Sequence, residues 1–566
     1  MTMWGPEVGT DGRTLFRLWA PDRKSVTLEI DGGETLAMTE AGGWFTVHAA
    51  ASAGTRYRFR LDADLAVPDP ASRLQAGGVH GWSVVAPPLS GSADEWRGRP
   101  WEEAVIQEVH VGALGGFTGV ADALPAMAEL GITAVELMPI GAFAGTRNWG
   151  YDGVLPFAPA EAYGSPQELR ALVKRAHEFG MMILLDVVYN HFGPDGNFLG
   201  AYASGFFHAR DTPWGGAVAV DWPEVAAYFR ENALMWIQDY GFDGLRFDAV
   251  HAIDNPKFLD ALAADIRAAV PDRPVHLILE NEENDADRLS SGRYDAQWND
   301  DFHNVLHVLL TGENEGYYAA FSEDSTGKLA RCLGEGFIYQ GEGMPHQEGR
   351  PRGKPSGHLP PTAFVSFLQN HDQIGNRALG ERLTTLVAPE RLRAATALLL
   401  LSPQIPLLFM GDETGSRTPF FFFTDFHDEL ADIVREGRRK EFAHFAAFAS
   451  EDARAQIPDP NAETTLENSR PVPGEDSEDW RGLYRDLLAL RHAEIVPRLR
   501  GSTAQGARVL GQGAVEAAWT LGDGAVLTVA LNIGDAAVDV RAAAPWYSLG
   551  TPGAPASFAA WLEPNV

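Results

Sequence analysis

The stretch Gly241-Phe-Asp-Gly-Leu-Arg-Phe-Asp248 contains a short apolar run that ends in an acidic residue. Runs of this kind recur through the middle of the chain and alternate with helical stretches, which is typical of parallel βα units. We predict eight such strands, at Ala104–Val111, Ile132–Pro139, Met182–Tyr189, Gly244–Ala249, Val275–Glu280, Tyr294–Asn299, Ala363–Asn370 and Ile405–Met410. Eight strands in this pattern predict an α/β fold with a (β/α)8 TIM barrel.

The connections between these strands are predicted to be helices, with one long exception. Helical patterns occur at Ser165–Phe179, Glu224–Asp239, Pro256–Val270 and Ala388–Leu401. The segment from Asn190 to Pro223 is long for a connection from a strand to a helix, and it is rich in Gly and Trp. Long loops in compact domains are usually functional, so we expect this one to contribute to a site.

Both ends of the chain alternate apolar and polar residues, which predicts antiparallel β structure. At the N-terminal end the alternating runs are Leu15–Leu18, Ser25–Ile30, Trp44–Ala49 and Arg56–Leu61. A linker is expected at Pro88–Pro100, and a helix at Ser477–Arg491 precedes alternating runs at Ala517–Trp519, Val526–Leu531 and Val538–Val540. We therefore predict three domains: a carbohydrate-binding-like β-sandwich over 1–90, the barrel with long βα loops over 97–497, and an all-β domain over 498–566.

Composition excludes several classes of protein. The 566 residues include 45 Lys and Arg against 77 Asp and Glu, a formal charge of −32, which argues against binding to nucleic acid or to an anionic membrane. Cys332 is the single cysteine, so an intramolecular disulfide and a cysteine-built zinc site are excluded. The first residues lack a basic segment followed by an apolar one, and no window approaches 18 apolar residues. We expect a soluble, cytoplasmic protein.

Active sites of (β/α)8 barrels lie at the C-terminal ends of the strands, where this sequence places three carboxylates. Asp248 and Glu280 end their strands, and Asp372 follows Phe367-Leu-Gln-Asn-His371. Arg246 lies two residues before Asp248 and therefore on the same face of the strand. Its positive charge should keep Asp248 ionised, while Glu280, beside another carboxylate, should tend to stay protonated. An ionised nucleophile and a protonated acid are what retaining glycoside hydrolysis requires, with about 5–5.5 Å between the two carboxyl groups.

Structural interpretations of the same residues compete with the catalytic one. An Asp at the end of a strand is more often a helix cap or an ion-pair member than a catalyst, and the joint placement of three favours catalysis. Asp186 could serve only to orient Arg246, and His191 could cap a turn. The acidic run from Glu280 to Asp287 is either a solvated face or a cation site, and the solvated face is favoured for all but Glu280. Phe420–Phe423 is expected to pack beneath a loop rather than form a binding platform, although an exposed member would suit a sugar ring. No HxxxH or HExxH spacing supports a zinc site.

Four short blocks, in order, resemble the signature blocks of the α-amylase superfamily of glycoside hydrolases. They are Asp186-Val-Val-Tyr-Asn-His191, Gly241–Asp248, the strand that ends at Glu280, and Phe367-Leu-Gln-Asn-His-Asp372. The resemblance implies Asp248 as nucleophile, Glu280 as general acid/base and Asp372 as the residue that grips sugar hydroxyls. It also implies substrate-binding roles for Arg246, His191, His371 and Tyr151. Asp186, in the first block, is assigned to substrate binding with them.

Longer blocks resemble one member family, the malto-oligosyltrehalose trehalohydrolases. They include Val67-Pro-Asp-Pro-Ala-Ser-Arg73, Gln297-Trp-Asn-Asp-Asp-Phe-His303, Leu310–Tyr318 and Phe421-Phe-Phe-Thr-Asp425. The resemblance implies hydrolysis of the α-1,4 bond next to a terminal trehalose, with release of trehalose and maltodextrin. The alternative is a 1,4-α-glucan branching enzyme or another α-amylase-type transglycosylase. A non-catalytic glucan-binding protein would be expected to have lost one of the three carboxylates.

Recognition of the trehalose end needs hydrogen bonds on the leaving-group side of the cleaved bond. Candidates are Asp300, Asp301 and His303 after the sixth strand, with Trp214 and Trp222 of the long loop as stacking surfaces. No metal and no cofactor is predicted. The expected partners are the sugar substrates and, metabolically, malto-oligosyltrehalose synthase. One departure from the family is Asn281-Glu-Glu after Glu280, which makes Glu282 an alternative acid. The apolar run ends at Glu280, so we favour Glu280.

Overall fold

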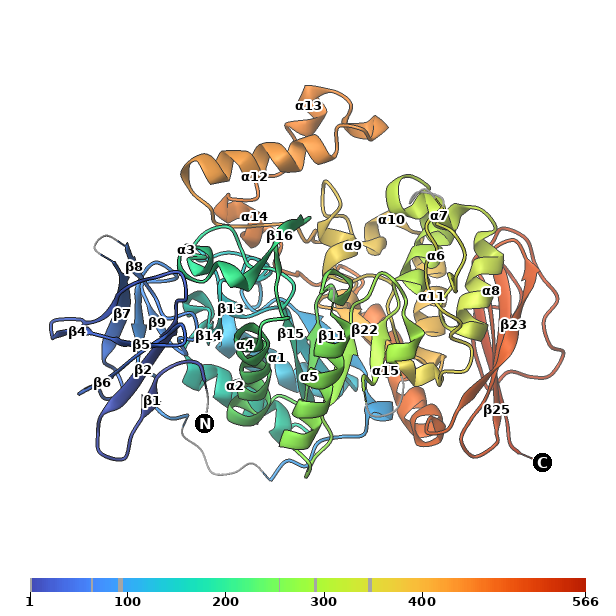
Figure 1. Cartoon of the computed structure of the whole chain (residues 1–566). Coiled ribbons are helices and arrows are strands. Elements are labelled where there is room, and N and C mark those ends of the chain that lie inside the picture. The colour runs from blue at the N-terminus through green and yellow to red at the C-terminus, as the bar shows by residue number, and fades with distance from the viewer. Residues whose placement is uncertain are drawn as a thin grey trace.

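The computed structural model describes residues 3–62, 65–89, 95–253, 255–289, 293–344 and 349–565. Residues 90–94 of the predicted linker lie outside this set. Figure 1 shows β strands of the N-terminal part at the left, the barrel in the middle and the C-terminal sheet at the right. Among the described residues, no helix combines the length and the apolar character needed to cross a membrane.

The N-terminal part consists of two antiparallel sheets, as the alternating pattern predicts. The first sheet has the order β1-β2-β6-β5, and the second has the order β4-β3-β7-β10-β9 with β8 paired to β7. Phe16 of β2 packs on Tyr57 of β7 with 4.6 Å between ring centroids, so the two sheets face each other. The strands are β1 (Glu7–Val8), β2 (Thr14–Trp19), β3 (Val26–Ile30), β4 (Thr35–Ala37), β5 (Thr39–Ala41), β6 (Trp44–Ala49), β7 (Arg56–Leu61), β8 (Leu65–Val67), β9 (Gln75–Ala76) and β10 (Trp82–Val84).

Eight parallel strands close into a barrel in the middle of the chain, and each falls within a predicted strand. Alternate side chains point inward, and Ile106, Ala134, Leu184 and Ile278 belong to one buried cluster in the barrel interior. The strands are β11 (Ile106–Val109), β12 (Ala134–Leu137), β15 (Met182–Val187), β18 (Gly244–Phe247), β19 (His276–Leu279), β20 (Ala296–Trp298), β21 (Phe364–Ser366) and β22 (Ile405–Phe409). The predicted (β/α)8 barrel is confirmed.

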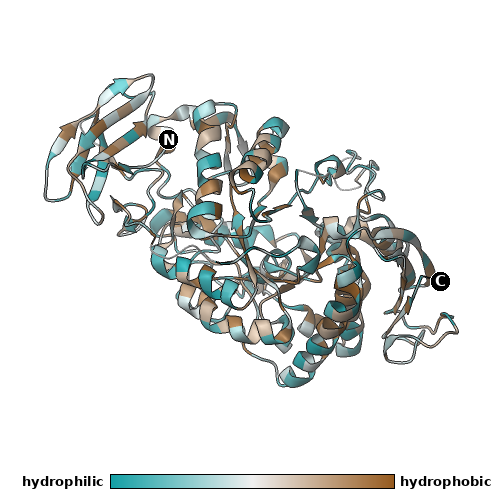
Figure 2. Cartoon of the chain, turned by 90° about the horizontal axis from the view of Figure 1, so that it is seen from below, coloured by the Kyte–Doolittle hydropathy of each residue, from teal (hydrophilic) through white to brown (hydrophobic). Residues whose placement is uncertain are grey.

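Helices surround the barrel, and Figure 2 shows hydrophobic and hydrophilic residues interleaved along them, as expected where one face packs and the other is exposed. Helix α2 begins sharply because Ser165 and Glu168 form a capping box and Pro166 occupies the first turn. The longer helices are α1 (Gly116–Leu130), α2 (Pro166–Glu178), α4 (Pro223–Met235), α5 (Pro256–Ala269), α6 (Asp300–Thr311), α8 (Ser325–Glu335), α11 (Pro389–Leu401) and α15 (Ser477–Leu490).

Loops at the C-terminal ends of the barrel strands carry short elements of their own. The long segment predicted from Asn190 to Pro223 contains α3 (Leu199–Tyr202) and a hairpin of β16 (Phe207–Thr212) and β17 (Gly215–Val218). Two further strands pair as β13 (Gly141–Ala142) and β14 (Leu155–Pro159). Short helices here are α7 (Ala319–Ser322), α9 (His371–Gly375) and α10 (Leu383–Leu386).

An arm of three helices stands above the barrel, where Figure 1 shows α12 and α13 projecting at the top. Its helices are α12 (Asp428–Glu441), α13 (Glu451–Arg454) and α14 (Glu463–Glu467). Arg438 of α12 donates hydrogen bonds to the main-chain oxygens of Gly375 (2.7 Å) and Arg377 (3.0 Å). The arm is therefore fastened to the loop that carries α9.

The C-terminal part is a five-stranded antiparallel sheet of order β23-β24-β25-β27-β26. Its strands are β23 (Thr503–Gly511), β24 (Ala514–Thr520), β25 (Val526–Asn532), β26 (Tyr547–Leu549) and β27 (Ser557–Glu563). The all-β prediction is confirmed, but the strand predicted at Val538–Val540 is wrong. That segment pairs with no strand, and only Val538 N–H donates to a loop oxygen, that of Gly553, at 2.9 Å.

Candidate active site

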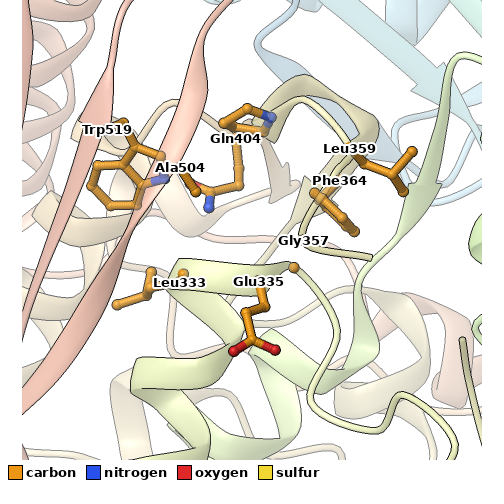
Figure 3. Close-up of a pocket in the computed structure, with 11 residues that line it drawn as sticks. Leu333, Glu335, Gly357, Leu359, Phe364, Gln404, Ala504 and Trp519 are labelled. Atoms are coloured by element: carbon orange, nitrogen blue, oxygen red, sulfur yellow. The ribbon is translucent and has the colours of Figure 1, made fainter. Parts of the chain in front are cut away.

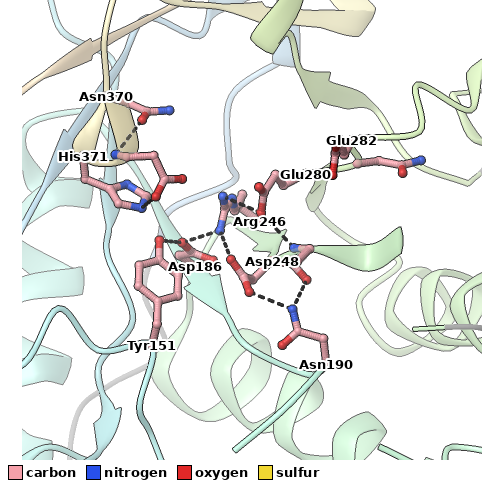
Figure 4. A network of polar contacts seen from close by, with 12 residues as sticks. Tyr151, Asp186, Asn190, Arg246, Asp248, Glu280, Glu282, Asn370 and His371 are labelled. Carbon is pink, nitrogen blue, oxygen red and sulfur yellow. Dashed lines mark hydrogen bonds and ion pairs between the residues drawn. The ribbon is translucent and has the colours of Figure 1, made fainter. Parts of the chain in front are cut away.

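Arg246 is the centre of a polar network at the mouth of the barrel (Figure 4). Its Nη1 donates to Asp186 Oδ2 at 2.6 Å and to Asp248 Oδ1 at 2.9 Å, and its Nη2 donates to Glu280 Oε2 at 3.0 Å. The guanidinium lies over the ring of Trp298 with 4.0 Å to the ring centroid, so its plane is held from below. One buried cation thus positions side chains from three strands, β15, β18 and β19.

Asp248 and Glu280 are each fixed by a second donor. Asn190 Nδ2 donates to Asp248 Oδ2 at 2.8 Å, and the main-chain N–H of Ala249 donates to Glu280 Oε2 at 2.8 Å. Burial raises the pKa of both carboxyls, and the positive charge of Arg246 opposes the rise. The pKa of Glu280 is raised to about 7, helped by the negative charges of Asp248 and Asp372. Arg246 therefore contacts both carboxyls, whereas the sequence predicts an effect of its charge on Asp248 alone.

The alternative acid, Glu282, has its carboxylate 3.8 Å from His251 Nε2. Its side chain is exposed, while Glu280 contacts Arg246 directly. The choice of Glu280 as the acid stays a prediction, and the contact of Glu280 with Arg246 supports it.

His371 connects the site to a buried acid on the first barrel strand. Its Nδ1–H donates to Glu108, and its Nε2 lies 3.3 Å from Asp372 Oδ1. Burial would lower the pKa of His371, but the negative charges of Asp372 and Glu108 outweigh burial and raise that pKa well above its usual value. In turn, burial would raise the pKa of Asp372, but the charge of His371 and its hydrogen bond, with the charge of Arg246, together outweigh burial and lower that pKa. His371 and Asp372 therefore behave as an ion pair.

Tyr151 and His191 complete the floor of the site. The Tyr151 hydroxyl donates to Asp186 Oδ2 at 2.5 Å, and its ring stacks on His371 with 5.1 Å between centroids. His191 Nε2 donates to the main-chain oxygen of Tyr151 at 3.0 Å. Asp186 itself is buried and accepts from both Tyr151 and Arg246, which fits the orienting role considered for it.

The three residues predicted to contact the leaving group after β20 differ sharply in their surroundings. Asp301 is 0% exposed and accepts hydrogen bonds from Arg352 Nη1 (2.6 Å), Asn284 Nδ2 (3.0 Å) and Ile338 N–H (2.8 Å). His303 is also buried, with Nδ1 donating to Leu368 O at 2.6 Å. Hydrogen bonds within the protein already occupy both side chains. The structure therefore does not support the expected contacts of Asp301 and His303 with a substrate.

Asp300 differs from these two residues because it makes no hydrogen bond to the described residues and is only partly buried. Desolvation by the surrounding protein, with the negative charge of Glu280, raises the pKa of Asp300 to about 8. It is the member of the predicted group that remains available to a ligand.

The two tryptophans of the long loop lie in different places. Trp214 is 47% exposed and stacks near His191 and His251, with 5.9 Å and 6.2 Å between centroids. Trp222 is 52% exposed, but its neighbour is Trp19 of the N-terminal sheet, at 6.2 Å. Trp214 therefore borders the site, whereas Trp222 lies at the junction with the N-terminal part.

Sequence reasoning missed three residues that the structure brings to the site. Glu108 holds His371, and Asn190 holds Asp248. Tyr317 is 77% exposed, and the charges of Glu282, Glu441 and Asp372 act on its hydroxyl, so it stands at the rim. An acid inside the apolar run of β11 and an amide beside His191 were signals for the first two, and Tyr317 lies within the family-like block Leu310–Tyr318.

A small hollow elsewhere in the molecule does not belong to this site. Figure 3 shows it between α8 and the C-terminal sheet, with Leu333 and Glu335 on one side and Trp519 on the other. Its lining is mostly apolar and includes no residue of the Arg246 network. It is a packing space between the barrel and the sheet.

Two family models match the chain. The model described as alpha amylase, catalytic domain, matches residues 85–212, which include β11, β12, β15 and the first part of the long loop. A second model, described as a domain of unknown function, DUF3459, matches residues 502–557 in the C-terminal sheet.

Relatives match over most of the chain. The malto-oligosyltrehalose trehalohydrolase of Deinococcus radiodurans is 41% identical over 507 residues, 85% of this chain and 82% of the relative. The protein of that name from Saccharolobus solfataricus is 38% identical over 505 residues, 86% of each chain. A solved structure from Salmonella typhimurium, described as an alpha amylase, is 41% identical, covers 100% of both chains and superposes with a TM-score of 0.93.

Proposed function

The chain belongs to the malto-oligosyltrehalose trehalohydrolases, within the α-amylase family of glycoside hydrolases, and on this premise we propose how its residues divide the work of cleavage. The enzyme is a glycoside hydrolase that releases trehalose from malto-oligosyltrehalose. The observation that carries the residue assignment is the contact of one guanidinium, that of Arg246, with both Asp248 and Glu280.

In the first step, Glu280 protonates the glycosidic oxygen of the bond next to the trehalosyl end. Asp248 attacks the anomeric carbon, the carbon–oxygen bond breaks, and trehalose leaves with the proton from Glu280. In the second step, the Glu280 carboxylate takes a proton from water, which attacks the anomeric carbon and releases the maltodextrin from Asp248. A pKa of about 7 suits Glu280 to both tasks because the group gains and loses its proton near neutral pH.

The geometry supports a retaining mechanism. Retention requires about 5–5.5 Å between the two carboxyl groups. Asp248 and Glu280 are hydrogen-bonded to different nitrogens of one guanidinium, which suits a separation of that order. Asp372 and His371 lie beside them as the pair that would bind sugar hydroxyls.

We assign the leaving-group side to Asp300 and Trp214. Asp300 has a free carboxyl beside the charge of Glu280, and Trp214 presents an exposed ring over His191 and His251. The hydroxyls of a neutral trehalose unit can hydrogen-bond to Asp300, and the apolar face of its sugar ring can stack on Trp214. Tyr151, His191 and Arg246 would hold the ring on the other side of the bond.

The test is a comparison of maltotriosyltrehalose with maltopentaose as substrates. The parent enzyme should release a disaccharide from maltotriosyltrehalose much faster than from maltopentaose. D248N should bind the substrate but not turn it over, whereas D272N, at an exposed position after α5, should match the parent. Substantial hydrolysis by D248N would remove Asp248 from its assigned role.

The alternative, a branching transglycosylase, would use the same carboxylates but transfer the glucan chain to a sugar hydroxyl in place of water. Incubation with amylose distinguishes the two, because only the transferase forms α-1,6 branches. We further propose that the substrate is made by malto-oligosyltrehalose synthase and that both enzymes are cytoplasmic.

A further inference from the structure

Glu136 of β12 is a buried acid to which the mechanism above assigns no task. Its side chain is 1% exposed, and neither carboxyl oxygen has a hydrogen-bond partner in the described structure. A buried polar group without a partner is costly, so its retention in a barrel strand calls for an explanation.

The strand geometry places Glu136 directly beneath the site. Ala134 belongs to the buried cluster in the barrel interior, and Glu136, two residues later, points to the same side. In the β-sheet register Glu136 is level with Glu108 of β11 and with Leu184 of β15, two residues before Asp186. Glu136 therefore lies between the apolar interior below and the charged layer above.

The charged groups that face Glu136 come from four elements: Asp186 (β15), Glu108 (β11), Arg246 (β18) and His371 (α9). Arg246 already contacts three carboxyls through Nη1 and Nη2, and His371 contacts two, while the Arg246 Nε–H is buried without a partner among the described residues. An ionised Glu136 would add an uncompensated negative charge. Burial, together with the charges of Asp186 and Glu108, raises the pKa of Glu136 well above its usual value, so the group is neutral and has one O–H to donate.

One acceptor nearby lacks a donor. Asp186 Oδ2 accepts from Arg246 and from the Tyr151 hydroxyl, whereas Asp186 Oδ1 is buried and has no partner among the described residues. We propose that Glu136 is a positioning residue that donates its carboxyl O–H to Asp186 Oδ1 and so fixes the carboxylate that holds Arg246 and Tyr151. The inference rests on the proposed roles of Asp248 and Glu280, because Arg246 is the group that aligns them.

A water molecule is the competing donor to Asp186 Oδ1. A hollow beside Asp186, lined also by Leu185, Tyr189 and Asn232, offers such a position. If water fills this role, the proton of Glu136 is dispensable and its removal should leave catalysis unchanged.

Two substitutions distinguish donation by Glu136 from donation by water. E136Q keeps a neutral donor of nearly the same shape, so its kcat on maltotriosyltrehalose should stay close to that of the parent. E136L fills the space but donates nothing, so its kcat should fall by about a hundredfold as Arg246 loses its alignment. KM and the unfolding midpoint of E136L should be close to parental, because an apolar side chain of similar size replaces a buried polar group. D69N, which replaces a buried acid in the N-terminal sheets by its amide, is the matched control and should keep the parental kcat.

Three outcomes would overturn the proposal: parental kcat in E136L, an equal loss in E136Q and E136L, or a loss that appears only together with a lowered unfolding midpoint. Infrared difference spectroscopy gives a second readout that needs no activity. The parent spectrum minus that of E136Q, taken near neutral pH, should contain the carbonyl band of a protonated carboxylic acid, and a carboxylate band in its place would also overturn the proposal. If the parent releases no trehalose from maltotriosyltrehalose, the proposed function fails while the infrared result still decides the protonation of Glu136.

Discussion

Asp300 and Asp301 are consecutive residues at the start of α6, yet only Asp301 has its carboxylate filled by donors from the protein. Successive residues of a helix point about 100° apart around its axis, so one of two neighbours can face the cleft while the other faces the interior. We therefore propose that the pair separates recognition of a ligand, at Asp300, from stability, at Asp301, within two positions of the chain.

Substitution of Asp300 should change the choice of substrate. D300A should lower the ratio of kcat/KM for maltotriosyltrehalose to kcat/KM for maltopentaose roughly five- to thirtyfold. This factor corresponds to a loss of about 1–2 kcal/mol of binding energy, because one hydrogen bond to the trehalose end is lost. D300N should retain most of the preference, since the pKa of about 8 makes Asp300 a neutral donor that an amide can imitate. An unchanged ratio in D300A would contradict the assignment.

Substitution of Asp301 should instead lower stability. D301A leaves Arg352 buried without its partner, and breaking a buried ion pair costs about 3–5 kcal/mol. Chemical denaturation should show this loss in the free energy of unfolding. The substrate preference of the folded fraction should remain parental, and a specific loss of trehalose release without destabilisation would restore Asp301 to the site.

The dependence of kcat/KM on pH should be bell-shaped. Glu280 must be protonated to act as an acid, so activity should fall as pH rises above its pKa of about 7. Asp248 must be ionised to act as a nucleophile, and because burial raises its pKa, activity should fall on the acidic side at a higher pH than for an ordinary Asp. Initial rates at low substrate across the pH range measure both limbs. A profile that stays flat well above pH 7 would argue against Glu280 as the acid.

Replacement of Arg246 by Lys should be far from conservative. A lysine carries one nitrogen and cannot contact Asp186, Asp248 and Glu280 in the geometry of a guanidinium. R246K should lower kcat by about a hundredfold or more.

Arg491 provides the control for R246K. It is an equally buried arginine that donates to main-chain oxygens of Leu400, Ser402 and Gln404 away from the site. R491K should reduce stability while the folded enzyme keeps its kcat. Equal kcat losses in the two variants would point to a general effect of removing a buried guanidinium.

The tryptophans Trp214 and Trp222 offer a matched pair on one loop. W214A should weaken ground-state binding of malto-oligosyltrehalose by about 0.5–1.5 kcal/mol, seen as a higher KM, because the ring that borders the site is removed. W222A should leave KM unchanged because that ring packs beside Trp19. A higher KM in W222A would extend the binding surface toward the N-terminal sheets.

The barrel could be predicted from sequence because its central strands are buried on both faces and read as continuous apolar runs. The predicted strands extend beyond the observed ones, because hydrogen-bonded pairing stops before the apolar pattern does. Val538–Val540 alternates like a strand and packs near β23, but it pairs with no strand of the described structure, which a local pattern cannot reveal. Burial of Asp301 depends on Arg352, 51 residues away in sequence, and contacts of that kind are set by the tertiary fold.

The shared contacts of Arg246 have a consequence for how this enzyme titrates. When one cation is bound by several carboxyls, protonation of any of them changes the charge felt by the others. The two limbs of the pH profile then describe the whole cluster, and each apparent constant is a property of the group. Substitution of Asp186, which contacts Arg246 but is neither the nucleophile nor the acid, should accordingly move both limbs, so the optimum pH can be adjusted without altering Asp248 or Glu280.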